Sequence, residues 1–297
     1  MYEKYFGFRE KPFTLSPDPS FLYLGKKHRT AFAMLEYGIS QGVGITVITG
    51  EIGSGKTTLI RHLLNSVEGN CTIGLISNTH RTFGELLQWA CLAYGLPCDR
   101  REKVVLYKQF VEFMIGEYAK GNRTVLVVDE AQNMDATTLE ELRVLSNINA
   151  DKDQVLQLVL VGQPELRTTL SKPDLRQLVQ RIGVAYHLRP LSLEETRTYI
   201  MHRLSVVGGN PDIFEPNAYG EVFEYSGGVP RLINKICDMA FVYAYAGKTT
   251  KVTGDLVREI VNEQRENGIE IYMAANDTAN IGEPIDPSPT GANKNGK

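Results

Sequence analysis

A buried strand that leads directly into a glycine-rich loop constrains this sequence more than any other feature. Residues 43–49 (VGITVIT) are apolar and β-branched, and residues 50–57 (GEIGSGKT) fit the pattern G-x-x-x-x-G-K-[ST] just before a predicted helix. Glycines let backbone N–H groups turn inward around phosphate oxygens, and the helix N-terminus adds its dipole. The sequence therefore predicts a phosphate-binding loop, in which Lys56 reaches the terminal phosphates and the Thr57 hydroxyl ligates Mg²⁺.

Polar residues follow two further apolar strands. Residues 125–128 (VLVV) deliver Asp129 and Glu130, and the strand at 155–161 leads to Gln163. Because parallel strands end at one edge of a sheet, we expect Asp129 beside the phosphate loop, holding Mg²⁺ through water. Glu130 would orient or deprotonate the attacking water, and the Gln163 amide would position that water next to the γ-phosphate. A metal ligand alone would suit a protein that only binds nucleotide as a switch, whereas the second carboxylate, Glu130, suits hydrolysis.

Strands and helices alternate through the first two thirds of the chain. Apolar periodicity predicts strands at 43–49, 72–77, 124–128, 155–161 and 182–188, and helices at 56–67, 82–94, 104–119, 136–147 and 174–180. Continuous apolar strands separated by helices indicate an α/β fold with a five-stranded parallel sheet that is covered on both faces. After Pro190 only helices are predicted, at 193–207, 215–225, 230–246 and 253–266.

This change of character suggests four units. We expect an N-terminal arm and linker helix at 1–42, an α/β nucleotide-binding domain at 43–190, a small helical lid domain at 191–268, and a tail at 269–297. The tail loses aromatic residues and gains Pro, Gly, Asn and Asp, so we expect it to be disordered.

Composition excludes some classes of protein. Lys plus Arg total 32 and Asp plus Glu total 35 in 297 residues, a net charge of −3, which excludes a strongly basic nucleic-acid coat and an acidic disordered chain. We expect no signal peptide and, without an apolar run of about 18 residues, no transmembrane helix. The four cysteines lack metal-ligand spacing, and buried reduced thiols are expected. These features indicate a soluble cytoplasmic protein.

The phosphate loop, the Asp-Glu strand end, the polar residue after the next strand and the helical lid together resemble the AAA+ ATPases. The resemblance implies an extra strand between the two nucleotide motifs. It also implies that Arg181, in Gln180-Arg181-Ile182, is the arginine finger that reaches a neighbouring subunit's γ-phosphate, with Arg176 as the second candidate. Arg231, in the GVPR sequence at 228–231, resembles the sensor-2 arginine that contacts the nucleotide.

A narrower resemblance covers about residues 1–265. The sequence is similar to the ExeA/GspA-type ATPases of secretion, pilus and exopolysaccharide-export systems at YFGF (5–8), PF (12–13), PDP (17–19), FLYL (21–24), HR (28–29), VDEAQ (128–132), LVGQPEL (160–166) and GGVPRL (227–232). This resemblance implies that the N-terminal aromatic segment packs near the adenine. The founding members continue into a transmembrane helix and a peptidoglycan-binding domain, whereas this sequence ends in a polar tail. We therefore expect no direct membrane insertion, and inner-membrane association only through a partner.

The predicted cofactors are ATP and Mg²⁺. The predicted catalytic residues are Glu130, Lys56, Arg181 and Gln163, and the predicted metal ligands are Thr57 and Asp129. The residues expected to hold the nucleotide are Gly50, Glu51, Ile52, Gly53, Ser54, Gly55, Lys56, Thr57, Thr58 and Arg231.

Two functions stay open. The first is an ATP-hydrolysing protein that oligomerises with nucleotide, as a ring or filament, and drives assembly of an envelope export system with a partner protein. The alternative is a transposition regulator that forms ATP-dependent filaments on duplex DNA and recruits transposase, for which basic clusters at 26–29, 100–103 and 120–123 are the supporting feature. A slow nucleotide-gated switch is disfavoured by Glu130.

Overall fold

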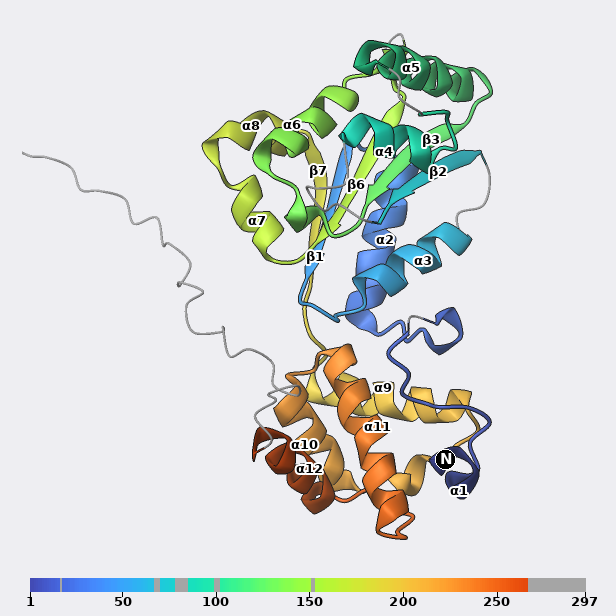
Figure 1. Ribbon diagram of the computed structural model, residues 1–297, viewed down its shortest axis with the longest axis vertical. Helices are drawn as coiled ribbons and strands as arrows, with labels where there is room; N and C mark the ends of the chain where they lie inside the picture. The colour runs from blue at the N-terminus through green and yellow to red at the C-terminus, as the bar shows by residue number, and fades with distance from the viewer. Residues whose placement is uncertain (17, 67–69, 78–84, 99–101, 151–152, 267–297) are drawn as a thin grey trace, which may run out of the picture.

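The computed structural model describes residues 1–16, 18–66, 70–77, 85–98, 102–150 and 153–266. An α/β part lies at one end of the molecule and a helical part at the other (Figure 1). Some expectations fall outside the described residues: the tail at 269–297, the start of the helix at 82–94, and the basic pair at 100–101 lie there, as do single residues at the ends of the PDP motif at 17–19 and the helix at 56–67, and the last two residues of the lid domain at 191–268.

The main sheet is parallel throughout. Its spatial order is β2-β3-β6-β1-β7, which confirms the predicted five-stranded parallel sheet. The strands are β1 (Ile45–Gly50), β2 (Cys71–Ile76), β3 (Arg123–Val128), β6 (Leu156–Gly162) and β7 (Ile182–Leu188). Strand β6 lies between β1 and β3, so the extra strand implied by the AAA+ resemblance is present. The ends of these three neighbouring strands therefore meet at one edge, beside the phosphate loop.

Helices cover both faces because successive strand residues point to opposite sides. Val125 and Val127 pack into one core, whereas Leu126 and Val128 pack into the other. The first core is covered by α2 (Lys26–Ser40) and α3 (Lys56–Ser66). The second is covered by α4 (Leu86–Ala93), α5 (Lys103–Ala119), α6 (Ala136–Leu145), α7 (Glu165–Leu170) and α8 (Arg176–Val179).

Three local details differ from the expectations. Helix α7 is not among the predicted helices; it starts at Glu165, and Pro164 is its N-cap residue. The helix expected at 174–180 is a 3₁₀ turn, η3 (Pro173–Leu175), followed by the single turn of α8. A small antiparallel pair, β4 (Asn149–Ala150) with β5 (Asp153–Gln154), is too short to give a periodic signal.

The helical part has a core of its own. It contains α9 (Leu193–Val206), the 3₁₀ turn η4 (Pro211–Ile213), α10 (Pro216–Ser226), α11 (Pro230–Ala246) and α12 (Gly254–Glu266). A capping box of Ser192 and Glu195 fixes the start of α9, four residues after β7 ends at Leu188. Among the helices that the structure describes, none is both long enough and apolar enough to cross a bilayer.

The N-terminal arm packs on this helical core rather than on the sheet. It holds α1 (Tyr2–Phe6) and the 3₁₀ turn η1 (Pro19–Phe21), and it buries Tyr2, Phe8 and Phe13 among the C-terminal helices. The rings of Phe13 and Phe241 stack with centroids 5.9 Å apart. Such aromatic burial stabilises by about 2 kcal/mol per ring. The first and last described segments of the chain therefore form one unit, and the cavity described below lies where that unit meets the sheet.

Candidate functional site

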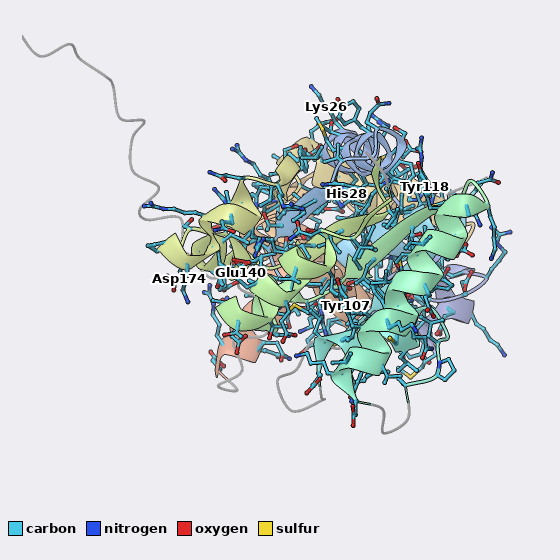
Figure 2. All side chains as sticks on the ribbon, turned by 90° about the horizontal axis from the view of Figure 1, so that it is seen from above. Lys26, His28, Tyr107, Tyr118, Glu140 and Asp174 are labelled. Carbon is cyan, nitrogen blue, oxygen red and sulfur yellow. The ribbon has the colours of Figure 1, made fainter. Side chains whose placement is uncertain are left out.

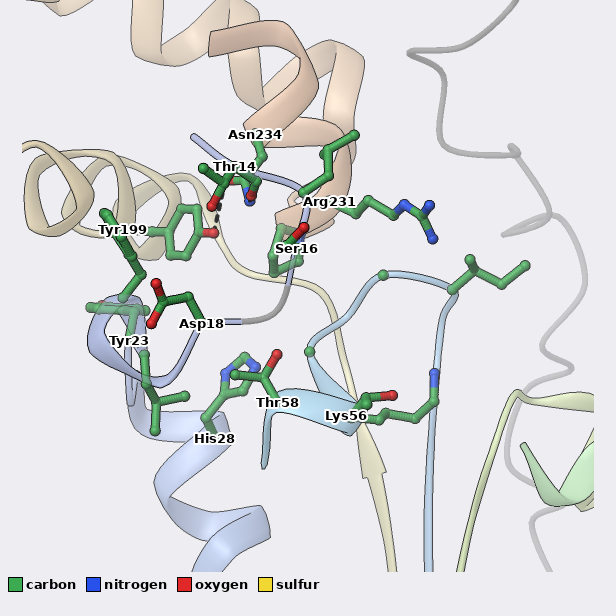
Figure 3. A pocket seen from close by; sticks show the side chains of 18 of the residues that line it. Thr14, Ser16, Asp18, Tyr23, His28, Lys56, Thr58, Tyr199, Arg231 and Asn234 are labelled. Carbon is green, nitrogen blue, oxygen red and sulfur yellow. Dashed lines mark hydrogen bonds between the residues drawn. The ribbon is translucent and has the colours of Figure 1, made fainter. Parts of the chain in front are cut away.

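The loop between β1 and α3 has the backbone shape that the sequence predicts. Gly53 and Gly55 have φ angles of 79° and 97°, in the left-handed region that residues with a Cβ rarely adopt. Helix α3 begins directly at Lys56. Loop N–H groups and the helix N-terminus thus lie together at the edge of the sheet, in the arrangement that binds phosphate groups. The loop and its surroundings are drawn in Figure 3.

Lys56 is a buried cation at the start of α3. Its Nζ donates to the backbone oxygens of Gly50 at 2.7 Å and Glu51 at 2.9 Å. Burial lowers the pKa of its ammonium group, while the charges of Glu130 and Asp129 act in the opposite direction. Among the described residues, no carboxylate forms an ion pair with Lys56. Because a buried charge is costly without a counter-ion, this site fits an anionic ligand.

Thr57 and Asp129 meet across the end of β3. The Thr57 Oγ1 donates to Asp129 Oδ2 at 2.9 Å, and the backbone N–H of Glu130 donates to Asp129 Oδ1, also at 2.9 Å. Burial raises the pKa of the Asp129 carboxyl group, and the bonds from Thr57 and Glu130 oppose that rise. A hydroxyl and a carboxylate are oxygen ligands that Mg²⁺ accepts, and a cation would remove the cost of burying the carboxylate. These residues therefore fit the predicted metal.

Glu130 follows in an unusual backbone conformation. Its φ of 54° and ψ of 36° are left-handed, which costs a non-glycine residue about 1 kcal/mol or more. Its carboxylate accepts hydrogen bonds from two side-chain amides. Gln132 Nε2 lies 2.5 Å from Glu130 Oε2, and Gln163 Nε2 lies 3.2 Å from the same oxygen. The structure thus brings Gln163 to Glu130, and it adds Gln132, for which we predicted no role.

Arg231 lies on the other side of the loop, in the first turn of α11. Its backbone N–H donates to the Gly53 oxygen at 3.2 Å, and its side chain lines the cavity (Figure 3). A Cβ on Gly53 would lie 2.4 Å from the Arg231 Cβ. Gly53 is therefore required both for its φ angle and for the approach of α11. The helical part touches the phosphate loop through this contact.

The two arginine-finger candidates lie outside the cavity of their own chain. Arg181 Nη1 donates to the backbone oxygen of Ser146 at 3.3 Å and to its Oγ at 3.2 Å. Arg176 is exposed at the start of α8. Neither side chain reaches the phosphate loop of this chain, so either one would have to act on a neighbouring copy.

The cavity has a volume of about 370 Å³ and continues from the phosphate loop towards the arm. His28 lines it beside the phosphate loop, and its far end is formed by Thr14, Leu15, Tyr23, Leu191, Tyr199, Arg203 and Asn234. A buried network connects part of this lining. Tyr199 OH donates to Asn234 Oδ1 at 2.8 Å, and Asn234 Nδ2 donates to the Thr14 oxygen at 3.1 Å. No motif predicted this network of Thr14, Tyr199 and Asn234, because the three residues lie far apart in the sequence.

His28 belongs to this lining and not to a basic surface. It is 5% exposed, and its Nε2 lies 3.0 Å from the Ser54 backbone oxygen. A carbonyl can only accept, so Nε2 carries the proton. Burial lowers the pKa of the imidazole. Figure 2 shows His28 further inside the molecule than the exposed Lys26 of the same helix.

Other members of the basic clusters also make internal contacts. Lys27 Nζ lies 3.0 Å from Glu195 Oε2 of α9 and donates to the Pro190 oxygen. Lys120 pairs with Glu117 at 2.7 Å, and Arg123 Nη1 donates to the Ile39 oxygen at 3.1 Å. These contacts reduce the positive charge available to a nucleic acid.

Comparisons with known proteins agree with this arrangement. The profile of a family described as "AAA domain" matches residues 39–170. General secretion pathway protein A of Aeromonas hydrophila is 42% identical over 258 residues, which cover 86% of this chain and 47% of the relative. Mu-like prophage FluMu DNA transposition protein B of Haemophilus influenzae is 29% identical over 142 residues, which cover 48% of this chain and 45% of the relative.

The fold has counterparts among solved structures. The ORC2 protein of Aeropyrum pernix, in its ADPNP-ADP complexes, superposes with a TM-score of 0.63 at 19% sequence identity. That match covers 86% of this chain and 72% of the other. The chain spans about half the length of the curated relatives that it matches, and at 19% identity the structural likeness concerns the fold alone.

Proposed function

We propose that this chain, a member of the AAA+ family of P-loop proteins, binds ATP with Mg²⁺ and hydrolyses it to ADP and phosphate. One observation carries the proposal: the Thr57 hydroxyl contacts the Asp129 carboxylate at 2.9 Å, and Glu130 follows directly in the chain. A hydroxyl, a carboxylate and a second carboxylate beside a phosphate loop supply the groups that hold the metal and activate water.

Each residue has a distinct role in this reaction. The loop N–H groups and Lys56 bind the phosphates, and Thr57 and Asp129 hold Mg²⁺, which neutralises phosphate charge when bound. Glu130 accepts the proton of the attacking water as the water oxygen bonds to the γ-phosphorus and the bond from that phosphorus to the ADP oxygen breaks. The Gln163 amide positions the water.

The helical part contributes Arg231 to the same reaction. Its side chain lines the cavity, within reach of a bound phosphate chain. In this proposal the unit at 43–190 holds the nucleotide, the helical domain at 191–268 acts as a lid, and the N-terminal arm and linker helix at 1–42 connect the two.

We further propose that the protein oligomerises with nucleotide and serves the assembly of an envelope export system, at the cytoplasmic side of the inner membrane through a partner protein. The 42% identity to general secretion pathway protein A supports this role. The identity to the transposition protein is lower and covers less of the chain, and it does not favour the DNA-binding alternative. Arg181 would complete the site of a neighbouring copy, because it lies outside the cavity of its own chain.

The ATPase rate and the particle shape, measured with and without duplex DNA at low and moderate salt, test this proposal. We expect Mg²⁺-dependent turnover that DNA leaves unchanged, with closed oligomers in the presence of ATP. Salt-sensitive stimulation together with filaments on DNA would contradict the envelope role, because such salt dependence reports phosphate contacts. Arg181→Ala should lose only the turnover that depends on oligomers. If Arg176→Ala shows this loss and Arg181→Ala does not, Arg176 is the arginine finger.

A further inference from the structure

A closed ring of hydrogen bonds joins Glu130, Gln132 and Gln163 at the ends of β3 and β6. We propose that Gln132 is the positioning residue of this ring and keeps the Glu130 carboxylate in place while Gln163 contacts the γ-phosphate or the attacking water. The inference rests on the proposed ATP hydrolysis with Glu130 as the base. It concerns a residue that makes no contact with the nucleotide in that mechanism.

The geometry fixes the orientation of the Gln132 amide. The backbone N–H of Gln163 lies 2.9 Å from Gln132 Oε1, and a backbone N–H can only donate. The oxygen of the Gln132 amide must therefore face Gln163, so its NH₂ group must face Glu130. The observed distance of 2.5 Å between Gln132 Nε2 and Glu130 Oε2 agrees with this assignment. Gln132 thus accepts a hydrogen bond from Gln163 and donates one to Glu130, and no other member is both acceptor and donor within the ring.

The two amides that reach Glu130 have different surroundings. Gln163 lines the cavity together with Glu130, whereas Gln132 is not part of that lining. A phosphate oxygen or a water in the cavity would compete for the Gln163 amide, and its 3.2 Å bond to Glu130 is the longer of the two. The Gln132 amide lies outside that lining, so a ligand in the cavity competes less directly for it. It is therefore the contact that can persist when nucleotide enters.

Gly162 provides independent support, because its lack of a side chain leaves room for Gln132. A Cβ on Gly162 would lie 2.9 Å from Gln132 Oε1, 3.0 Å from Leu166 Cδ2 and 3.2 Å from the Gln132 backbone nitrogen. Gly162 is not among the glycines with positive φ, so its backbone would accept alanine. The last position of β6 is therefore constrained by its neighbours, Gln132 and Leu166, and not by its own conformation.

Gln132→Glu is the sharpest test, because it keeps the shape and replaces the donor by a carboxylate oxygen. The new carboxylate can still accept from the Gln163 N–H, but it faces Glu130, and two facing carboxylates share a proton. As the pH falls, kcat of the variant should then decrease with a midpoint about one pH unit higher than in the wild type. At neutral pH we expect kcat to fall about 10-fold or more, with KM changed less than about threefold.

Gly162→Ala and Asn133→Ala complete the design. Gly162→Ala should also lower kcat, although it alters no hydrogen-bonding group. Asn133→Ala removes an exposed side chain from the same 3₁₀ turn, η2 (Ala131–Asn133), and should leave both kcat and its pH profile unchanged. Thermal unfolding and binding of a non-hydrolysable ATP analogue show that each variant is folded.

The outcomes separate the two proposals. If Gln132→Glu keeps the wild-type pH midpoint and kcat within about twofold while Glu130→Gln is inactive, the role of Gln132 is wrong and the proposed function stands. If Glu130→Gln itself keeps wild-type turnover, the assignment of Glu130 as the base fails. A loss of thermal stability in Gln132→Glu with an unchanged pH profile would show a merely structural role and overturn the inference.

Discussion

The two ends of the cavity are built in different ways. At the phosphate end, Gly53 comes from the loop, Lys56 and Thr57 follow it in the first turn of α3, and Asp129 and Glu130 are adjacent in the chain. At the far end, the lining combines the arm (Thr14), α9 (Tyr199) and α11 (Asn234). The phosphate end depends mainly on local backbone shape, whereas the far end exists only when segments distant in sequence pack together. Variants at the two ends should therefore differ in what they disturb.

Lys56→Ala should give the largest effect. It removes the cation that the loop buries against the Gly50 and Glu51 oxygens, which is the group that would contact the terminal phosphates in the proposed reaction. We expect ATP turnover to fall about 100-fold or more, with little change in thermal unfolding. Lys172→Ala, at an exposed lysine, is the matched control and should retain wild-type turnover. Near-normal turnover in Lys56→Ala would mean that the loop alone binds the phosphates.

The difference between the two ends also explains what the sequence could predict. The phosphate loop, the Asp-Glu pair and Gln163 follow apolar strands, so local pattern and parallel topology predict their meeting, and Thr57, Asp129, Glu130 and Gln163 do meet. His28 was interpreted as part of a basic cluster, because nothing local shows that its helix turns this side chain inward towards Ser54.

Gln132 escaped the sequence analysis for a related reason. It lies two residues after Glu130, inside the VDEAQ motif, but its role follows from a contact with Gln163, which is 31 residues away in the chain. The arm shows the same limit on a larger scale. Its aromatic spacing is visible in the sequence, whereas the surface that receives Tyr2 and Phe13 is built by helices from the other end of the described chain.

Gly53→Ala should disturb the junction between the two ends and give an intermediate effect. The added Cβ would lie 2.4 Å from the Arg231 Cβ, and alanine would also be strained at a φ of 79°. We expect ATP affinity to fall about 10-fold, measured by fluorescent-nucleotide titration. Gly42→Ala separates the two causes, because Gly42 has a φ of 69° with nothing within 4 Å of the added Cβ. Equal losses of affinity in both variants would show that the contact with α11 does not matter.

His28→Gln should give the smallest effect, visible in the pH dependence of stability. Burial lowers the pKa of His28 in the folded protein below its ordinary 6.5, so below pH 6.5 the unfolded chain binds a proton that the folded protein excludes. Stability contributed by the neutral ring is therefore present above pH 6.5 and is lost as the pH falls.

Urea unfolding at pH 7.5 and at pH 5.5 measures this loss. Glutamine does not titrate and can still donate to the Ser54 oxygen, so at pH 7.5 the variant should lie within about 1 kcal/mol of the wild type. Its loss on acidification should be smaller by about the amount that His28 contributes. An unchanged loss in the variant would mean that His28 is protonated equally in the folded and unfolded protein, and that water reaches its ring.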